Sequence, residues 1–136
     1  MLWPRRLRET DSETLREGRI RQVLSALRKN LPGIRALFVL SAKGELLDWA
    51  VEEPRVDIRA VASEHATLLR IIQRTSIDTG MGDFEEQILI TSSSQVIFRR
   101  LPDDSFAVCV CSSSEQLGRL RYELRHCLLY STFSSL

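Results

Sequence analysis

The sequence lacks any apolar stretch of the roughly 18 residues that a membrane-spanning helix requires. It also lacks a charge imbalance, because the formal net charge of its 136 residues is +1, which gives no overall field to attract nucleic acid or acidic membranes. The basic segment Met1–Arg8 has no apolar segment behind it and so does not look like a secretory signal. We expect residues 1–11 to be a mobile arm and residues 12–133 to form one domain, with neither nucleic acid nor a membrane as a partner.

Cysteine and histidine are scarce. The three cysteines, Cys109, Cys111 and Cys127, are odd in number and have no disulfide-framework spacing, which is typical of reduced thiols in the cytoplasm. A metal site built on the first two would need two more ligands, and the only histidines are His65 and His126. Because cysteine often serves as a small apolar core residue, we expect this pair to fill the core and no metal to be bound.

The sequence contains none of the motifs that carry common enzyme chemistry. The phosphate loop G-x-x-x-x-G-K-S/T, the dinucleotide motif G-x-G-x-x-G, the zinc motif H-E-x-x-H and the nucleophile motif G-x-S-x-G are all absent. Adjacent carboxylates such as Glu85 and Glu86 point to opposite faces of a strand, so we expect solvation rather than a shared acid–base site. His65 falls within the apolar stripe of a predicted helix, which favours a core histidine. We therefore expect no catalytic residues and no cofactor, and the chain is not expected to be an enzyme.

Hydrophobic periodicity predicts a helix, two strands, a helix, three strands and a final helix. The predicted helices cover residues 20–31 with an N-terminal cap within 10–13, residues 58–79 with Asp57 as cap, and residues 117–128; the predicted strands cover 34–40, 46–51, 84–91, 95–101 and 106–111. The strands at 34–40 and 106–111 are apolar on both faces and therefore need cover on both sides. The fold class is α/β (α+β): a five-stranded antiparallel sheet with helices on both faces, in the order αββαβββα.

The second helix has an unusual outer face. Small or modest residues recur there at helical spacing, namely Ala60, Ser63, Thr67 and Ile71. A solvated face would more naturally carry Glu, Lys or Gln, so the stripe favours close approach of a second helix from a twin chain. The alternative is a second face that packs only within the chain.

Three arginines flank this stripe: Arg59, Arg70 and Arg74. They are suited to pair with an acidic partner surface. Simple solvation of three surface arginines is the alternative interpretation.

Three motifs resemble those of one family, the roadblock or dynein light chain seven family with its bacterial MglB-like members. Leu117–Arg125 resembles its final-helix motif, a leucine-glycine pair followed by an Arg/Tyr-Glu-Leu segment. Thr79–Glu86 resembles its glycine-containing approach to the middle strand, and Pro32–Ile34 with Ser41–Leu47 resembles its opening hairpin. The motifs occur in the family's order and the resemblance covers about residues 12 to 131.

The resemblance implies a profilin-like fold and a homodimer in which the middle strands join two sheets and the long helices pack together. It therefore adds Ile88 and Ile90 of the middle strand to the expected dimer interface. It also implies binding to a Ras-like small GTPase through the face that carries the long helices. Some bacterial relatives activate GTP hydrolysis by reshaping the GTPase's own catalytic loops, while other members are scaffolds.

We therefore expect a homodimeric regulator of a Ras-like small GTPase in the cytoplasm. A scaffold subunit of a GTPase or motor complex is the first alternative. A small-ligand sensor ranks last, because such a sensor needs a pocket with converging polar groups, and the sequence places bulky apolar residues there.

Overall fold

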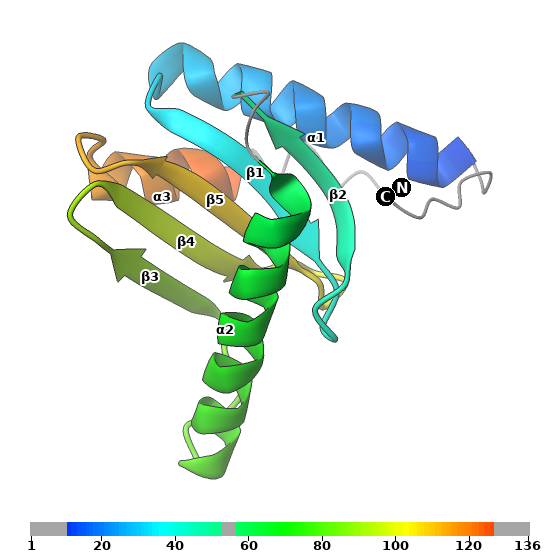
Figure 1. The fold of residues 1–136 in the computed structure, drawn as a ribbon, viewed down its shortest axis with the longest axis vertical. Helices are drawn as coiled ribbons and strands as arrows, with labels where there is room; N and C mark the ends of the chain where they lie inside the picture. Colours follow the sequence, from blue (N-terminus) through cyan, green and yellow to red (C-terminus); the bar gives the residue numbers. More distant parts are fainter. Residues whose placement is uncertain (1–10, 53–56, 127–136) are drawn as a thin grey trace.

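The described residues fold into helices and strands in the order that the sequence predicts. The computed structural model describes residues 11–52 and 57–126. The elements are α1 (Asp11–Asn30), β1 (Ile34–Leu40), β2 (Leu46–Val51), α2 (Ile58–Asp78), β3 (Glu86–Ile90), β4 (Ser94–Arg100), β5 (Phe106–Ser112) and α3 (Leu117–Arg125). The strands form one antiparallel sheet in the order β2-β1-β5-β4-β3 (Figure 1). Apart from Asp11, the expected N-terminal arm lies outside the described residues, as do Cys127 and the end of the expected domain.

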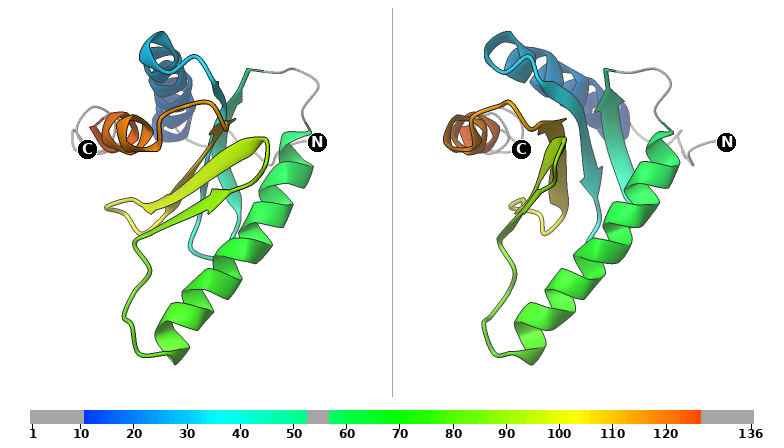
Figure 2. Two further views of the ribbon diagram at one scale, coloured as in Figure 1. Left: turned by 90° about the vertical axis from the view of Figure 1, so that its left-hand side faces the viewer. Right: turned by 60° about the vertical axis from the view of Figure 1, so that its left-hand side comes forward.

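The sheet has a core on each face, which confirms the interpretation of the two-sided apolar strands. On one face, Leu37 and Cys109 pack with residues of α1 and α3. On the other face, Phe38 and Phe98 pack with residues of α2. Because successive side chains of a strand point to opposite faces, the central strands β1 and β5 supply both cores. The result is a layer of α1 and α3, the sheet, and a layer of α2 (Figure 2).

Local signals place α2 against the sheet. The Asp57 side chain accepts a hydrogen bond from the Ala60 backbone N–H at 3.2 Å, which caps the helix as expected. Before it, the turn between β1 and β2 contains Gly44 at φ +93°, a left-handed conformation that favours glycine. This turn directs β2 back along β1 and brings the hairpin tip beneath α2.

Strand β3 is shorter than the expected strand at residues 84–91. Phe84 is buried and its ring stacks on Phe106 with centroids 5.2 Å apart, so this residue anchors the approach to the strand rather than extending it. At the other end, the Thr91 N–H donates to the Ser94 carbonyl at 2.8 Å and closes the predicted serine-rich turn. Strand β3 is therefore a short edge strand, and its only partner among the described residues is β4.

Candidate protein-interaction surface

Helix α2 is longer than the sheet is wide. Its 21 residues span about 31 Å at the rise of an α-helix, whereas five strands place the outer two about 19 Å apart. Its buried residues, Ala62, Ala66 and Leu69, all precede Arg70, and the second half projects past the sheet (Figure 2). This half leaves Ile71 and Ile77 exposed by 56% and 55%. A single copy of the chain therefore presents unburied apolar surface there.

The predicted outer stripe is exposed along its whole length. All four residues, Ala60, Ser63, Thr67 and Ile71, are exposed in the described part of the chain. At 3.6 residues per turn, the middle of this stripe points away from the buried side of α2. Packing among the described residues leaves these four side chains accessible. The Thr67 hydroxyl donates to the Ser63 carbonyl at 3.2 Å, so its polarity is satisfied within the helix.

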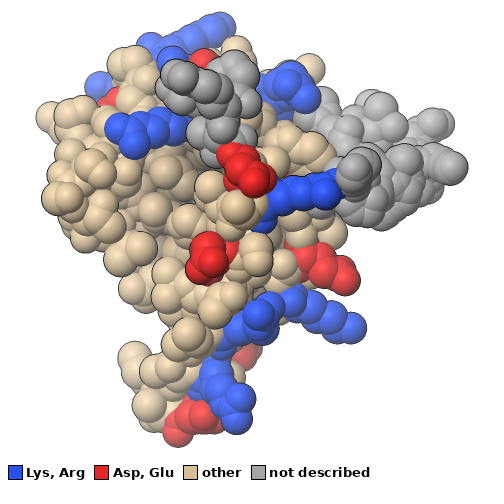
Figure 3. Space-filling view, in the orientation of Figure 1, with Lys and Arg blue, Asp and Glu red and all other residues tan. Residues whose placement is uncertain are grey.

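The two flanks of α2 differ in chemistry. One flank carries the half-buried apolar residues Leu68 and Ile72, which pack against the sheet core on the α2 face. The other flank carries Arg59 and Arg70 and faces the β1–β2 turn. In Figure 3 the surface to the left of α2 is largely uncharged, whereas Lys and Arg, with some Asp and Glu among them, lie to its right. The charged and the apolar side chains of α2 therefore lie on opposite flanks of the helix.

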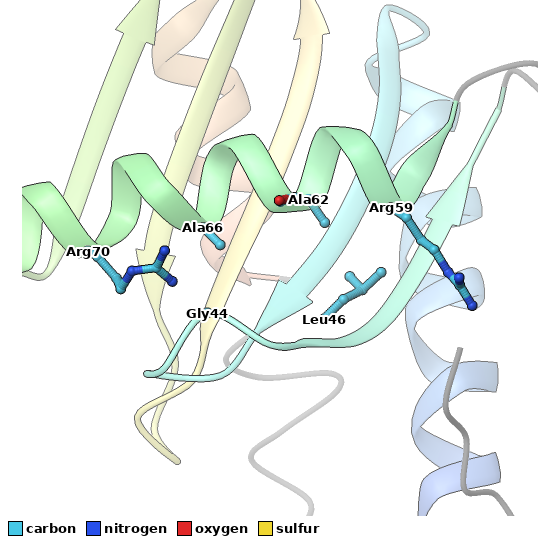
Figure 4. Close-up of a pocket in the computed structure, with 7 residues that line it drawn as sticks. Gly44, Leu46, Arg59, Ala62, Ala66 and Arg70 are labelled. Carbon is cyan, nitrogen blue, oxygen red and sulfur yellow. The ribbon is translucent and has the colours of Figure 1, made fainter. Parts of the chain in front are cut away.

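Two of the three predicted arginines border one small hollow. The hollow measures about 290 Å³ and is lined by Gly44, Leu46, Arg59, Ala62, Ser63, Ala66 and Arg70. Figure 4 shows its arginines at opposite ends of the exposed helix segment, with the β1–β2 hairpin on the other side. Among these lining residues, the two arginines are charged and none is a carboxylate.

The hollow depends on close contact between the hairpin tip and α2. A Cβ atom added to Gly44 would lie 2.8 Å from Nη1 of Arg70 and 3.1 Å from Cβ of Ala66. The same Arg70 nitrogen donates to the Lys43 carbonyl at 3.4 Å. The small residues Gly44 of the turn and Ala66 of α2 thus leave room for the Arg70 guanidinium at the rim of the hollow. The sequence shows the glycine, but it does not show that Arg70 is its neighbour.

Arg74 lies apart from this hollow. Its Nε is 3.6 Å from Oδ2 of Asp78 one turn further along α2, and both side chains are largely exposed. Surface pairs of this kind are weak, so Arg74 remains able to exchange partners. The structure therefore brings together two of the three predicted arginines and places the third at the projecting half of α2.

The edge of β3 combines free backbone groups with apolar side chains. Leu89 is 37% exposed and Ile90 is 61% exposed, while Ile88 is half-buried against the core on the α1 and α3 face. Exposed edge strands usually carry charge or proline, which prevent pairing with another chain. Residues Gln87 to Ile90 carry neither. This edge is thus suited to pair with a further strand.

A charged cluster joins the start of β3 to α3, and sequence analysis did not find it. The Glu86 carboxylate lies 3.6 Å from Nη1 of Arg99 on β4 and accepts hydrogen bonds from Nε, at 3.1 Å, and Nη2 of Arg121 on α3. The hydrogen bond and charge of Glu86 raise the pKa of Arg121. The expectation that solvation accounts for Glu86 is therefore wrong. Glu86 lies opposite Arg99 in the pairing of β3 with β4. This alignment was the only signal that could have revealed the cluster, and it is known only once the two strands have paired.

The histidine and cysteine candidates belong to the core rather than to a site. Nδ1 of His65 lies 2.7 Å from the Val61 carbonyl, and its ring contacts Phe38 and Phe98 with centroids 5.8 and 5.7 Å away. This confirms the core interpretation of His65. Cys109 and Cys111 are buried and unbridged. Burial raises the pKa of both thiols, that of Cys111 to about 11.

Known structures share this architecture. The chain superposes on Myxococcus xanthus MglB with a TM-score of 0.71, at 12% sequence identity over 93% of this chain and 87% of that chain. An MglB structure with a tetrameric arrangement gives a TM-score of 0.72, at 16% identity over 89% of this chain and 93% of that chain. A Roadblock/LC7 domain from Streptomyces avermitilis gives 0.69, at 16% identity over 79% of this chain and 90% of that chain. The chain has the roadblock fold.

The likeness is one of fold, because no protein-family profile and no curated protein matches the sequence. The roadblock fold confirms the predicted order of elements and the five-stranded antiparallel sheet. Within residues 11–52 and 57–126, no helix is both long and apolar enough to cross a membrane.

Proposed function

We propose that two copies of this roadblock chain form a homodimer, and that the dimer binds a Ras-like small GTPase and controls its GTP hydrolysis. The projecting half of α2 carries the proposal, because it leaves apolar residues exposed beside the edge of β3, which has no second strand partner among the described residues. Contiguous exposed apolar surface marks interaction sites in soluble proteins. The roadblock fold supports the proposal, since a structure of MglB with the same fold has a tetrameric arrangement.

In the proposed dimer, the β3 edges pair and each α2 extends over the twin's sheet. This arrangement would cover Leu89 and the uncharged surface beside α2 (Figure 3). It also accounts for the length of α2, since the half that projects from one copy finds a surface on the other. The dimer contact then comprises Ala60, Ser63, Thr67, Ile71, Ile88 and Ile90. Small residues at the first three positions allow the helices to approach closely.

The GTPase is proposed to bind on the arginine side of α2. Arg59, Arg70 and Arg74 supply positive charge, and the hollow between the first two has room for an acidic side chain of the partner. Charge complementarity of this kind guides association and fixes orientation. In this proposal the chain acts in the cytoplasm and by contact, as a regulator without catalytic residues or a cofactor of its own.

The test is GTP hydrolysis by Ras-like GTPases of the same genome, measured with and without the purified chain. A regulator is expected to increase the rate when present in less than equimolar amounts. Binding without any change in rate would favour the alternative, a scaffold subunit. Absence of binding to every such GTPase would refute the proposal.

A further inference from the structure

Another cavity, of about 560 Å³, lies where the second half of α2 and the start of β3 approach α3. It is lined by this half of α2, by residues 81–87 that lead into β3, by Arg99 of β4 and by two arginines of α3. Cavities that hold small ligands typically measure about 300–1,000 Å³. The cavity is therefore large enough for a small molecule, and it shares no lining residue with the arginine hollow at the β1–β2 turn.

The α2 side of this cavity carries exposed apolar side chains. Ile71 of α2 and Met81 of the following segment are 56% and 78% exposed. Beside them, Ile72 is half-buried against the core on the α2 face, and Phe84 is buried and stacked on Phe106. The apolar part of a ligand would cover Ile71 and Met81, which is favourable because it removes apolar surface from water.

The α3 side of the cavity carries arginines. Arg121 and Arg125 lie four residues apart on α3 and therefore share one face of the helix. Arg125 is exposed and has no ion pair or hydrogen bond within residues 11–52 and 57–126. The Nε atom of Arg99 is buried, and no described residue accepts a hydrogen bond from it. Hydrogen-bonding capacity of these arginines is thus unused.

The carboxylates of the lining leave this positive charge in excess. Asp83 and Glu85 belong to the lining, but both pair with Arg100, which does not. Nη2 of Arg100 lies 3.8 Å from Oδ2 of Asp83, and its Nε lies 3.9 Å from Oε2 of Glu85. Among the lining residues, Glu86 is then the one carboxylate that remains for three arginines. This imbalance favours an additional anion.

We infer that this cavity binds a small amphipathic carboxylate, with its charged group at Arg121 and Arg125 and its apolar chain against Ile71 and Met81. The forked donors of arginine match the two oxygens of a carboxylate. The inference goes beyond the proposed regulator and depends on neither the homodimer nor the GTPase. Of the lining residues, Ile71 alone belongs also to the proposed dimer contact, so the arginines lie outside that contact.

Octanoate is a suitable probe, titrated into the full chain in a calorimeter at concentrations below those at which it forms micelles. Two controls separate its parts: 1-octanol has the same apolar chain without the charge, and acetate has the charge without the chain. Charge-assisted hydrogen bonds and apolar contact both contribute to binding in the cavity. We therefore expect octanoate to bind saturably and at least about ten-fold more tightly than either control.

Substitutions in the lining locate the bound octanoate. Arg125→Gln removes a charge without a described partner, and Met81→Ser removes exposed apolar surface, so both variants should fold normally, which circular dichroism checks. Each should weaken octanoate binding by about five- to ten-fold. Arg119→Gln lies on the same helix but outside the lining, and this matched control should change the affinity by less than about two-fold.

The possible outcomes separate this site from the proposed function. Saturable octanoate binding that both lining variants weaken and Arg119→Gln retains would support the inference. Absence of saturable binding, equal binding of 1-octanol, or binding that either lining variant leaves unchanged would overturn it. A parent chain that sediments as a monomer would refute the homodimer but not this site, because all of its lining residues belong to one copy.

Discussion

The change Ile71→Asp addresses the proposed dimer most directly, because Ile71 lies at the start of the projecting half of α2. The side chain is 56% exposed in one copy. Full burial of an isoleucine side chain contributes about 1.5–3 kcal/mol of favourable free energy. Covering the exposed part of Ile71 therefore stabilises the dimer by about 1–1.5 kcal/mol per copy, or about 2–3 kcal/mol for two copies. Desolvating the two introduced aspartates, at about 1 kcal/mol each, costs about 2 kcal/mol more.

The sum predicts that Ile71→Asp weakens the dimer by about 4–5 kcal/mol, which raises its dissociation constant by about 1,000-fold or more. Sedimentation equilibrium over a wide range of concentrations measures this constant. Ile71→Val serves as the matched control, because it keeps the apolar contact and is expected to change the constant by less than about ten-fold. Thr67→Glu, on the same stripe, should also favour the monomer.

The variant must remain folded for this comparison to be meaningful. The Ile71 side chain is not part of the buried core, so the free energy of unfolding of the isolated monomer should change by no more than about 0.5 kcal/mol. Circular dichroism and urea unfolding check this expectation. A folded Ile71→Asp protein with an unchanged dissociation constant would refute the assignment of this part of α2 to the dimer contact.

Three further predictions concern the arginine hollow, the hairpin tip and the charged cluster. The double reversal Arg59→Glu and Arg70→Glu should weaken GTPase binding about 10- to 100-fold at low salt and reduce the salt dependence of binding. Calorimetric titration measures the affinity, and Arg119→Glu on α3 is the control that should leave it unchanged. Gly44→Ala should lower the free energy of unfolding by about 1–2 kcal/mol, because φ is +93° and the new Cβ meets Arg70; unchanged thermal unfolding would contradict this account. Glu86→Gln should cost about 1–3 kcal/mol in urea unfolding, because two arginines lose their carboxylate; a neutral effect would show that the cluster contributes no net stability.

Sequence alone predicted the secondary structure well, because each element has its own local signal. The period of apolar residues identified α2 within a residue of its end, and Asp57 and Gly44 marked its cap and the preceding turn. The error at β3 has a local cause, since Phe84 continues the apolar pattern of the strand but packs on Phe106 instead. Periodicity does not distinguish a strand residue from an anchoring residue just before it.

The candidate site was only partly accessible to the same reasoning. Helical spacing was sufficient to place Ala60, Ser63, Thr67 and Ile71 on one exposed face. It did not show that Arg70 contacts the hairpin tip, or that Arg74 pairs with Asp78 outside the hollow. Such contacts join residues that are distant in sequence or depend on how the side chain turns, so no local pattern encodes them.

The sequence by itself determined the order of elements, the two-sided burial of β1 and β5 and the exposed face of α2, because these follow from periodicities of two and 3.6 residues. Tertiary structure decided the rest: which strand forms the edge, how far α2 projects beyond the sheet, and that Glu86 lies between Arg99 and Arg121. These features depend on strand order and on the length of a helix relative to the width of a sheet. Both are set only when the elements pack together.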